Sequence, residues 1–211
     1  MFALSEQEIT EGPFLDIAGG ASSFTAQLHA RGLPAVATDP LYAGEPEQVI
    51  AAARREIDVS TAKLAAAADS YDWSYYGSIR QHRQMREASL ERFAADFTRP
   101  DARSRYIAAS LPDLPFADGT FALVLCSHFL FLYGDQLDET FHRRALAEML
   151  RVTRPGGQVR VYPLVTLQWR TPPYLSLLLA ELEKQAQVRM IDTRLPFTPV
   201  KSPVLQLDKF A

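Results

Sequence analysis

Apolar and polar positions divide the chain into short apolar runs and longer stretches with helical spacing. Strands are predicted at residues 14–18, 35–38, 105–109, 121–126, 158–164, 188–195 and 204–208. Helices are predicted at residues 22–31, 47–68, 79–97, 135–152 and 173–187, after a first helix that begins at Ser5 with its capping-box partner Glu8. This alternation is typical of a parallel sheet with helices on its faces, so we expect an α/β fold.

Glycine and proline are distributed unevenly along the chain. All but one of the ten glycines, and all fourteen prolines, lie outside residues 47–99. That stretch is rich in Ala, Glu, Arg and Gln, which favours helix. At 211 residues the chain has the length of one domain with a sizeable insertion. We therefore expect a single domain over residues 1–211, with a helical insertion at residues 41–103 between the second and third strands.

Composition and charge exclude several classes of protein. With one cysteine and four histidines that lack ligand spacing, the sequence predicts neither a disulfide framework nor a metal site. The net charge of −3 offers no general attraction to nucleic acid or to an anionic membrane. The N-terminus turns acidic too early for a signal peptide, and no apolar run reaches the length of a membrane span. We expect a soluble, cytoplasmic protein.

The best-defined chemical feature is the segment Leu-Asp-Ile-Ala-Gly-Gly-Ala-Ser-Ser at residues 15–23, between the first strand and a helix. Its small residues let a ligand approach the backbone, and Asp39 ends the second strand, where a carboxylate can accept both hydroxyls of a ribose. Neither the dinucleotide nor the phosphate-loop glycine pattern is present. A ligand with a ribose and no phosphate, such as S-adenosylmethionine, fits this pattern. The alternative is a tight turn followed by a solvated Asp39.

Four segments in order resemble the class I S-adenosylmethionine-dependent methyltransferases with a type 11-like domain. Residues 15–23 resemble their first motif, and Asp39 resembles the acid that ends their second strand. Residues 114–121, Leu-Pro-Phe-Ala-Asp-Gly-Thr-Phe, are similar to the approach to their fourth strand, and residues 148–157 to the turn before their fifth. The resemblance implies a doubly wound, mainly parallel, seven-stranded Rossmann-like sheet of order 3-2-1-4-5-7-6, with the seventh strand antiparallel.

The resemblance also implies a cofactor site. The residues that it places there are Asp16, Ala18, Gly19 and Gly20 at the methionine part, Asp39 at the ribose, Ser110 and Leu111 at the adenine, and Cys126, Ser127 and His128 beneath the sulfonium. Ala18 replaces the usual first glycine of the motif, and Ser110 stands where many relatives carry an aspartate. His128 is the candidate general base, with Tyr133 as the second candidate. The alternative is a hydrogen-bonded histidine at a strand end.

The predicted insertion carries the candidate substrate residues. Four aromatics fall within residues 71–76, and four basic or imidazole side chains follow within residues 80–86 without an intervening acid. On a helix over residues 79–97, Arg83 and Arg86 fall on the side of the apolar stripe. We expect a lid in which these arginines bind a carboxylate or phosphate and Trp73, Tyr75 and Tyr76 cover the acceptor. The alternative is that both arginines extend past the edge of the core.

The predicted function is methyl transfer from S-adenosylmethionine to a small-molecule oxygen, nitrogen or carbon nucleophile. Two other classes stay open at this point. One is a binding protein that kept the fold and lost the chemistry, which the departures at Ala18 and Ser110 allow. The other is a nicotinamide-dependent oxidoreductase, since an acid such as Asp39 serves a ribose in both classes.

Overall fold

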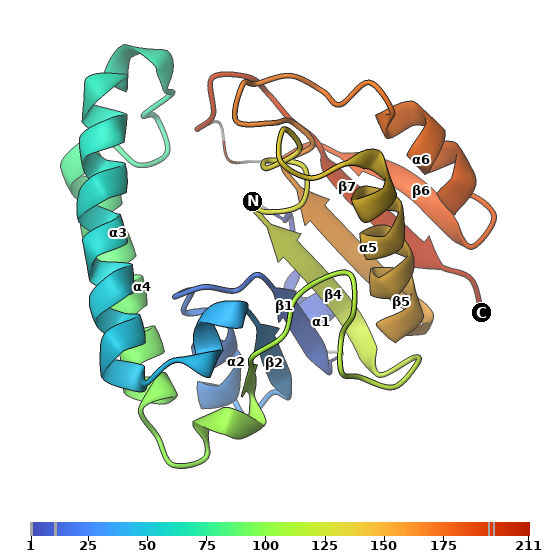
Figure 1. Cartoon of the computed structure of the whole chain (residues 1–211), viewed down its shortest axis with the longest axis horizontal. Helices are drawn as coiled ribbons and strands as arrows, with labels where there is room; N and C mark the ends of the chain where they lie inside the picture. Colours follow the sequence, from blue (N-terminus) through green and yellow to red (C-terminus); the bar gives the residue numbers. More distant parts are fainter. Residues whose placement is uncertain (1, 11, 194, 196) are drawn as a thin grey trace.

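A seven-stranded sheet with the order β3-β2-β1-β4-β5-β7-β6 forms the centre of the molecule (Figure 1). The structure is a computed structural model that describes residues 2–10, 12–193, 195 and 197–211. The strands are β1 (Phe14–Ile17), β2 (Ala35–Thr38), β3 (Tyr106–Ile107), β4 (Phe121–Ser127), β5 (Thr153–Tyr162), β6 (Ala186–Ile191) and β7 (Val204–Lys209). β7 runs antiparallel to β5 and β6, and the other neighbours are parallel. The predicted strand order and antiparallel seventh strand are confirmed.

Six α-helices connect and cover these strands. They are α1 (Glu6–Thr10), α2 (Phe24–Ala30), α3 (Pro46–Ala66), α4 (Ile79–Phe97), α5 (Glu139–Val152) and α6 (Leu175–Leu182) among the described residues. The predicted capping box forms: the Glu8 amide donates to the Ser5 hydroxyl at 3.2 Å, and the Ser5 amide donates to the Glu8 carboxylate at 2.8 Å. Ser78 caps α4 in the same manner by accepting from the Gln81 amide at 3.2 Å. None of the described helices is both long and apolar enough to cross a membrane.

The central strand β4 is buried on both faces. Val124 and Cys126 belong to the core beneath α5 and α6, whereas Leu123 and Leu125 belong to the core that includes Leu28 of α2. Alternate side chains of one strand thus enter two separate apolar layers. Helices therefore cover both faces of the sheet, as parallel strands require.

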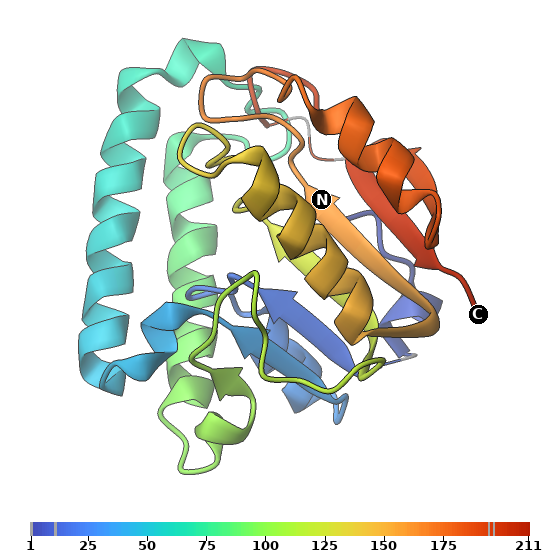
Figure 2. The same ribbon diagram turned by 45° about the vertical axis from the view of Figure 1, so that its right-hand side comes forward.

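Helices α3 and α4 form an antiparallel pair that stands beside the carboxyl ends of the strands (Figures 1 and 2). Their shared core includes Ile57 of α3 and Phe93 of α4. The end of α4 is tied to β3, because the buried Asp96 carboxylate accepts from the Arg105 guanidinium at 2.8 and 2.7 Å and from the Tyr106 hydroxyl at 2.9 Å. This ionic anchor fixes the helix pair against the sheet.

The prediction of a turn at residues 154–157 before the fifth strand is wrong. β5 begins at Thr153, directly after α5, and it pairs with β4 through a bulge between the Phe121–Thr153 and Leu123–Gln158 partners. Gly156 adopts a φ of +69°, and a Cβ at Gly157 would lie 2.8 Å from the Ala122 carbonyl oxygen. The glycines therefore allow close approach of two paired strands.

Candidate functional site

The loop after β1 and the end of β2 are joined through one carboxylate. Asp39 accepts from the Gly20 amide at 3.1 Å and from the Leu41 amide at 2.9 Å, one at each oxygen. The Tyr42 hydroxyl donates to the Gly20 carbonyl at 2.8 Å and closes the connection from the other side. Each Asp39 oxygen retains a second lone pair, so the carboxylate can also accept from ligand hydroxyls.

Small residues leave space at this loop. A Cβ at Gly19 would lie 2.9 Å from the Tyr42 hydroxyl oxygen, so no larger residue fits there without a shift. Gly20 has a φ of +51° and nothing within 4 Å of its Cβ position, which leaves room for a ligand beside the backbone. Ala18 holds a left-handed φ of +54°, a conformation that favours glycine and marks local backbone strain.

Asp16 lies beside Asp39 and is only 6% exposed. Burial, with the charge of Asp39 as the second cause, raises the pKa of Asp16 to about 7. Two neighbouring carboxyl groups at the strand ends favour a ligand that carries positive charge together with hydroxyl donors. S-adenosylmethionine has a sulfonium, an ammonium and the hydroxyl groups of a ribose, so the two carboxyl groups fit this cofactor.

The end of β4 brings the candidate base to the same edge of the sheet. His128 follows Ser127 with a left-handed φ of +52°, and its Nδ1 lies 2.8 Å from the Ser127 hydroxyl oxygen. Desolvation by the surrounding protein lowers the pKa of His128 to about 4, although the residue as a whole remains exposed. The imidazole is therefore neutral at pH 7 and able to accept a proton.

The other predicted residues at this edge of the sheet differ in exposure, and two of them are buried in the core. Cys126 is fully buried, and burial raises the pKa of its thiol to about 12, so its side chain packs in the core. Leu111 is likewise buried in the core, whereas Ser110 is exposed and bridges to Asp113. Tyr133 is 39% exposed, and its ring lies 6.2 Å from that of Phe129 at a tilt of 47°.

The predicted substrate aromatics pack around Phe197, which lies between β6 and β7. Trp73 meets the Phe197 ring edge-on at 5.4 Å, Tyr76 does so at 4.9 Å, and His82 stacks on it at 5.2 Å. The Trp73 indole also donates to the Ala68 carbonyl at 2.8 Å, and Tyr75 is 57% exposed. These contacts attach the tip of the α3–α4 pair to the other end of the sheet. No pattern in the sequence points to Phe197 as their partner.

The two predicted arginines separate. The Arg83 guanidinium forms ion pairs with Asp58 at 2.6 Å and Glu87 at 2.7 Å, and it lines a different surface hollow. The expectation that Arg83 and Arg86 face one cleft is therefore wrong, because acids on α3 and α4 hold Arg83 on their own side. Arg86 donates to the Ser60 hydroxyl and lines the cavity described next.

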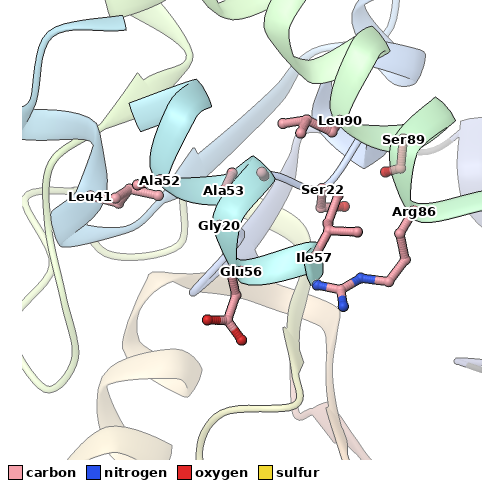
Figure 3. A pocket seen from close by; sticks show the side chains of 11 residues that line it. Gly20, Ser22, Leu41, Ala52, Ala53, Glu56, Ile57, Arg86, Ser89 and Leu90 are labelled. Atoms are coloured by element: carbon pink, nitrogen blue, oxygen red, sulfur yellow. The ribbon is translucent and has the colours of Figure 1, made fainter. Parts of the chain in front are cut away.

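A cavity of about 550 Å³ lies between the loop after β1 and the α3–α4 pair (Figure 3). Its described lining is Gly20, Ala21, Ser22 and Leu41 at the loop side, Ala52, Ala53, Glu56 and Ile57 on α3, and Arg86, Ser89 and Leu90 on α4. The Ser89 hydroxyl accepts from the Ser23 amide at 3.0 Å and so joins α4 to the loop. Glu56 and Ser89 were not predicted as site residues. The sequence offers one indication of them, which is that each lies on a predicted helix at helical spacing from other residues of the lining.

Comparison with known families finds a methyltransferase domain in this chain. The model of the family described as methyltransferase domain matches residues 59–161, from α3 to the end of β5. The match spans just under half of the chain, and it identifies a methyltransferase domain similar to those of the class I S-adenosylmethionine-dependent methyltransferases. The matched region does not include the loop after β1 or Asp39, so the assignment of these residues to the cofactor rests on the geometry above.

Two curated proteins and one solved structure are similar to this chain. The chain is 27% identical over 188 residues to an uncharacterized protein of Methanocaldococcus jannaschii, covering 89% of this chain and 82% of that protein. It is 40% identical over 76 residues to the demethylmenaquinone methyltransferase of Beutenbergia cavernae, covering 36% of this chain and 26% of that enzyme. The structure of an O-methyltransferase family protein from Burkholderia thailandensis superposes with a TM-score of 0.52 at 12% identity, covering 97% of this chain and 53% of that one. This likeness shows the Rossmann-like methyltransferase fold.

Proposed function

We propose that this methyltransferase binds S-adenosylmethionine at the ends of β1 and β2 and methylates a small-molecule acceptor. The observation that carries the proposal is the Asp16–Asp39 pair beside the open Gly20 loop. In this proposal Asp39 holds the ribose, and Asp16 with Ala18, Gly19 and Gly20 faces the methionine part. Ser110, Leu111, Cys126 and Ser127 remain proposed neighbours of the adenine and sulfonium.

The cavity and the charge support a small acceptor. A volume of about 550 Å³ lies within the range of small-molecule sites, roughly 300–1,000 Å³. The net charge of −3 gives no electrostatic advantage for nucleic acid. Because α3 and α4 form most of the cavity wall, residues 41–103 would act as a cover over the acceptor.

The residues of this chain align the reactants and accept a proton. When bound, S-adenosylmethionine supplies an electrophilic methyl group on sulfur and leaves as S-adenosylhomocysteine. The acceptor's lone pair forms the bond to the methyl carbon while the carbon–sulfur bond breaks and its electrons stay on sulfur. In the tautomer whose Nδ1–H donates to the Ser127 hydroxyl, Nε2 of His128 is the accepting atom and takes the acceptor's proton. The loop after β1 and the α3–α4 pair would hold the two reactants in line.

We expect a His128→Gln substitution to lower kcat by about tenfold or more, because general-base catalysis is lost while alignment remains. The dissociation constant for S-adenosylhomocysteine should change by less than about twofold. In the wild type, the pKa of about 4 keeps His128 neutral across neutral pH, so its protonation should lower kcat only as the pH falls toward 4. A Tyr133→Phe variant tests the second candidate base. Unchanged kcat in the His128 variant would show that the reaction needs no base at this position.

Transfer of a labelled methyl group tests the class of acceptor. The protein would be incubated with methyl-labelled S-adenosylmethionine and, separately, with the small-molecule, protein and nucleic-acid fractions of a cell extract. We expect label in the small-molecule fraction, with one equivalent of S-adenosylhomocysteine formed for each methyl transferred. Label confined to protein or nucleic acid would contradict the small-acceptor proposal, and the Asp39→Ala variant serves as the inactive control.

A further inference from the structure

Arg86 is the one arginine of α4 within the described lining of the cavity. It is half-buried at the cavity wall, and among the described lining residues it alone carries a positive charge. Arg86 donates a hydrogen bond to the neutral Ser60 hydroxyl, and no ion pair to Arg86 occurs within the described part of the chain. Arg83, one turn earlier, has two carboxylate partners. Of these two arginines, Arg86 is the one whose guanidinium forms no ion pair with a carboxylate among the described residues, and it is the one that lines the cavity.

The α3 side of the cavity is apolar near Arg86, whereas Ser89 lies beside it on α4. Ala52, Ala53 and Ile57 of α3 face Leu90 of α4 across the space. Figure 3 shows the Arg86 guanidinium extending past Ile57 toward the side of the cavity on which the Glu56 carboxylate also lies. A ligand in this space therefore meets one cationic group, an apolar wall, two serines and one acid at the margin.

We propose that the acceptor is an apolar monocarboxylate whose carboxylate binds Arg86 and whose body packs between α3 and α4. The inference rests on the proposed function and adds the chemical class of the substrate. A guanidinium binds a carboxylate through two parallel hydrogen bonds, and the Ser60 contact holds the Arg86 side chain in one orientation for it. The methylated atom is a different nucleophile of the same molecule, because a carboxylate paired with arginine is a weaker nucleophile.

Glu56 argues for one negative charge rather than two. Burial lowers the pKa of Arg86, whereas the charge of Glu56 and the Tyr76 hydroxyl raise it, so Glu56 is close enough to act on the guanidinium. A phosphate dianion would place a second charge near this carboxylate without a second cation to balance it. The electrostatics of the cavity therefore favour a carboxylate.

The cavity adjoins the cofactor residues and is separate from most of them. Gly20 is the one predicted cofactor residue within its described lining, and neither Asp16 nor Asp39 lines it. A ligand here would border the methionine loop without contacting the ribose acceptor. This position is that of a second reactant.

The test compares carboxylates with neutral amides of the same shape. Protein saturated with S-adenosylhomocysteine is titrated with 4-hydroxybenzoate, 4-hydroxyphenylacetate and 2-hydroxyhexanoate, and with the primary amide of each, by calorimetry and saturation-transfer NMR. We expect at least one carboxylate to bind about tenfold or more tightly than its amide. Arg86→Met should abolish that preference, while the affinity for S-adenosylhomocysteine stays within about twofold.

Matched variants keep the result interpretable. Arg83→Met removes a charge one turn away, where the ion pairs with Asp58 and Glu87 are exposed, and should retain the full carboxylate preference. Arg86→Gln repeats the test with a polar side chain in case the methionine variant does not fold.

Three outcomes would overturn the inference. They are no preference for any carboxylate of the set, an equal loss in the Arg83 variant, and a tenfold loss of S-adenosylhomocysteine affinity in the Arg86 variants. The last would show that Arg86 binds the cofactor's own carboxylate. Failure of the wild type to bind S-adenosylhomocysteine would instead contradict the proposed function itself.

Discussion

An Asp16→Asn variant is expected to be more stable than the wild type by about 4 kcal/mol in free energy of unfolding at pH 8. The folded-state pKa of Asp16 is about 7, raised by burial and by Asp39 from a usual value of 3.8. Below pH 3.8 the carboxyl group is neutral in both states and carries no penalty. Between pH 3.8 and pH 7 the Asp16 carboxyl group ionises in the unfolded chain but stays mostly protonated in the folded protein. The free energy of unfolding of the wild type therefore falls as the pH rises. Asparagine has nearly the same shape and no charge to desolvate.

Urea denaturation of both proteins between pH 4 and pH 8 measures this effect. The difference in free energy of unfolding should be small near pH 4, grow through pH 5 and 6, and level off above pH 7. Asp69→Asn, at an exposed position in the short 3-10 turn after α3, should change stability by less than about 0.5 kcal/mol at every pH. A stability difference independent of pH would refute the assignment of the effect to ionisation.

The second large effect is expected on cofactor affinity. Asp39→Ala should weaken binding of S-adenosylmethionine and S-adenosylhomocysteine by about 100-fold or more, close to 2.7 kcal/mol. The substitution removes the proposed ribose acceptor, and it also leaves the Gly20 and Leu41 amides without their shared partner. Both changes act on the bound cofactor, because the loop that Asp39 holds would contact it.

Calorimetric titration of this variant with S-adenosylhomocysteine measures the loss, with the melting temperature as a check on folding. Asp113→Ala is the matched control, because Asp113 lies in the turn after β3 and forms an exposed ion pair with Arg144. It should bind the cofactor like the wild type. An Asp39 variant that binds within about threefold of the wild type would show that the ribose is held elsewhere.

The sequence predicted correctly those elements whose ends are marked by neighbouring residues in the chain. The bounds of β2 and α4 agree with the structure, because β2 ends at Asp39–Pro40 and α4 begins after the capping Ser78. The start of β5 was missed because the bulge depends on how closely β4 approaches Gly157, which is a contact between strands. The strand order came from resemblance to a family, since periodicity alone does not set it.

The sequence predicted which acids lie together in the candidate site, but not the properties that depend on contacts between distant segments. Asp16 and Asp39 lie 23 residues apart, and parallel pairing of β1 with β2 brings their ends together as expected. The shift in the pKa of Asp16 follows from burial in three dimensions and has no signature in the sequence. Arg83 and Arg86 differ in role because Asp58 on α3 pairs with one of them. Helical spacing on α4 cannot reveal a partner on another helix.

Titration calorimetry of the wild-type protein with S-adenosylmethionine, S-adenosylhomocysteine and NAD at neutral pH tests the central claim most directly. The account predicts one site for each of the first two ligands, with dissociation constants in the micromolar range, and no heat of binding with NAD. Absence of binding by both S-adenosyl ligands, or binding of NAD with similar affinity, would contradict it.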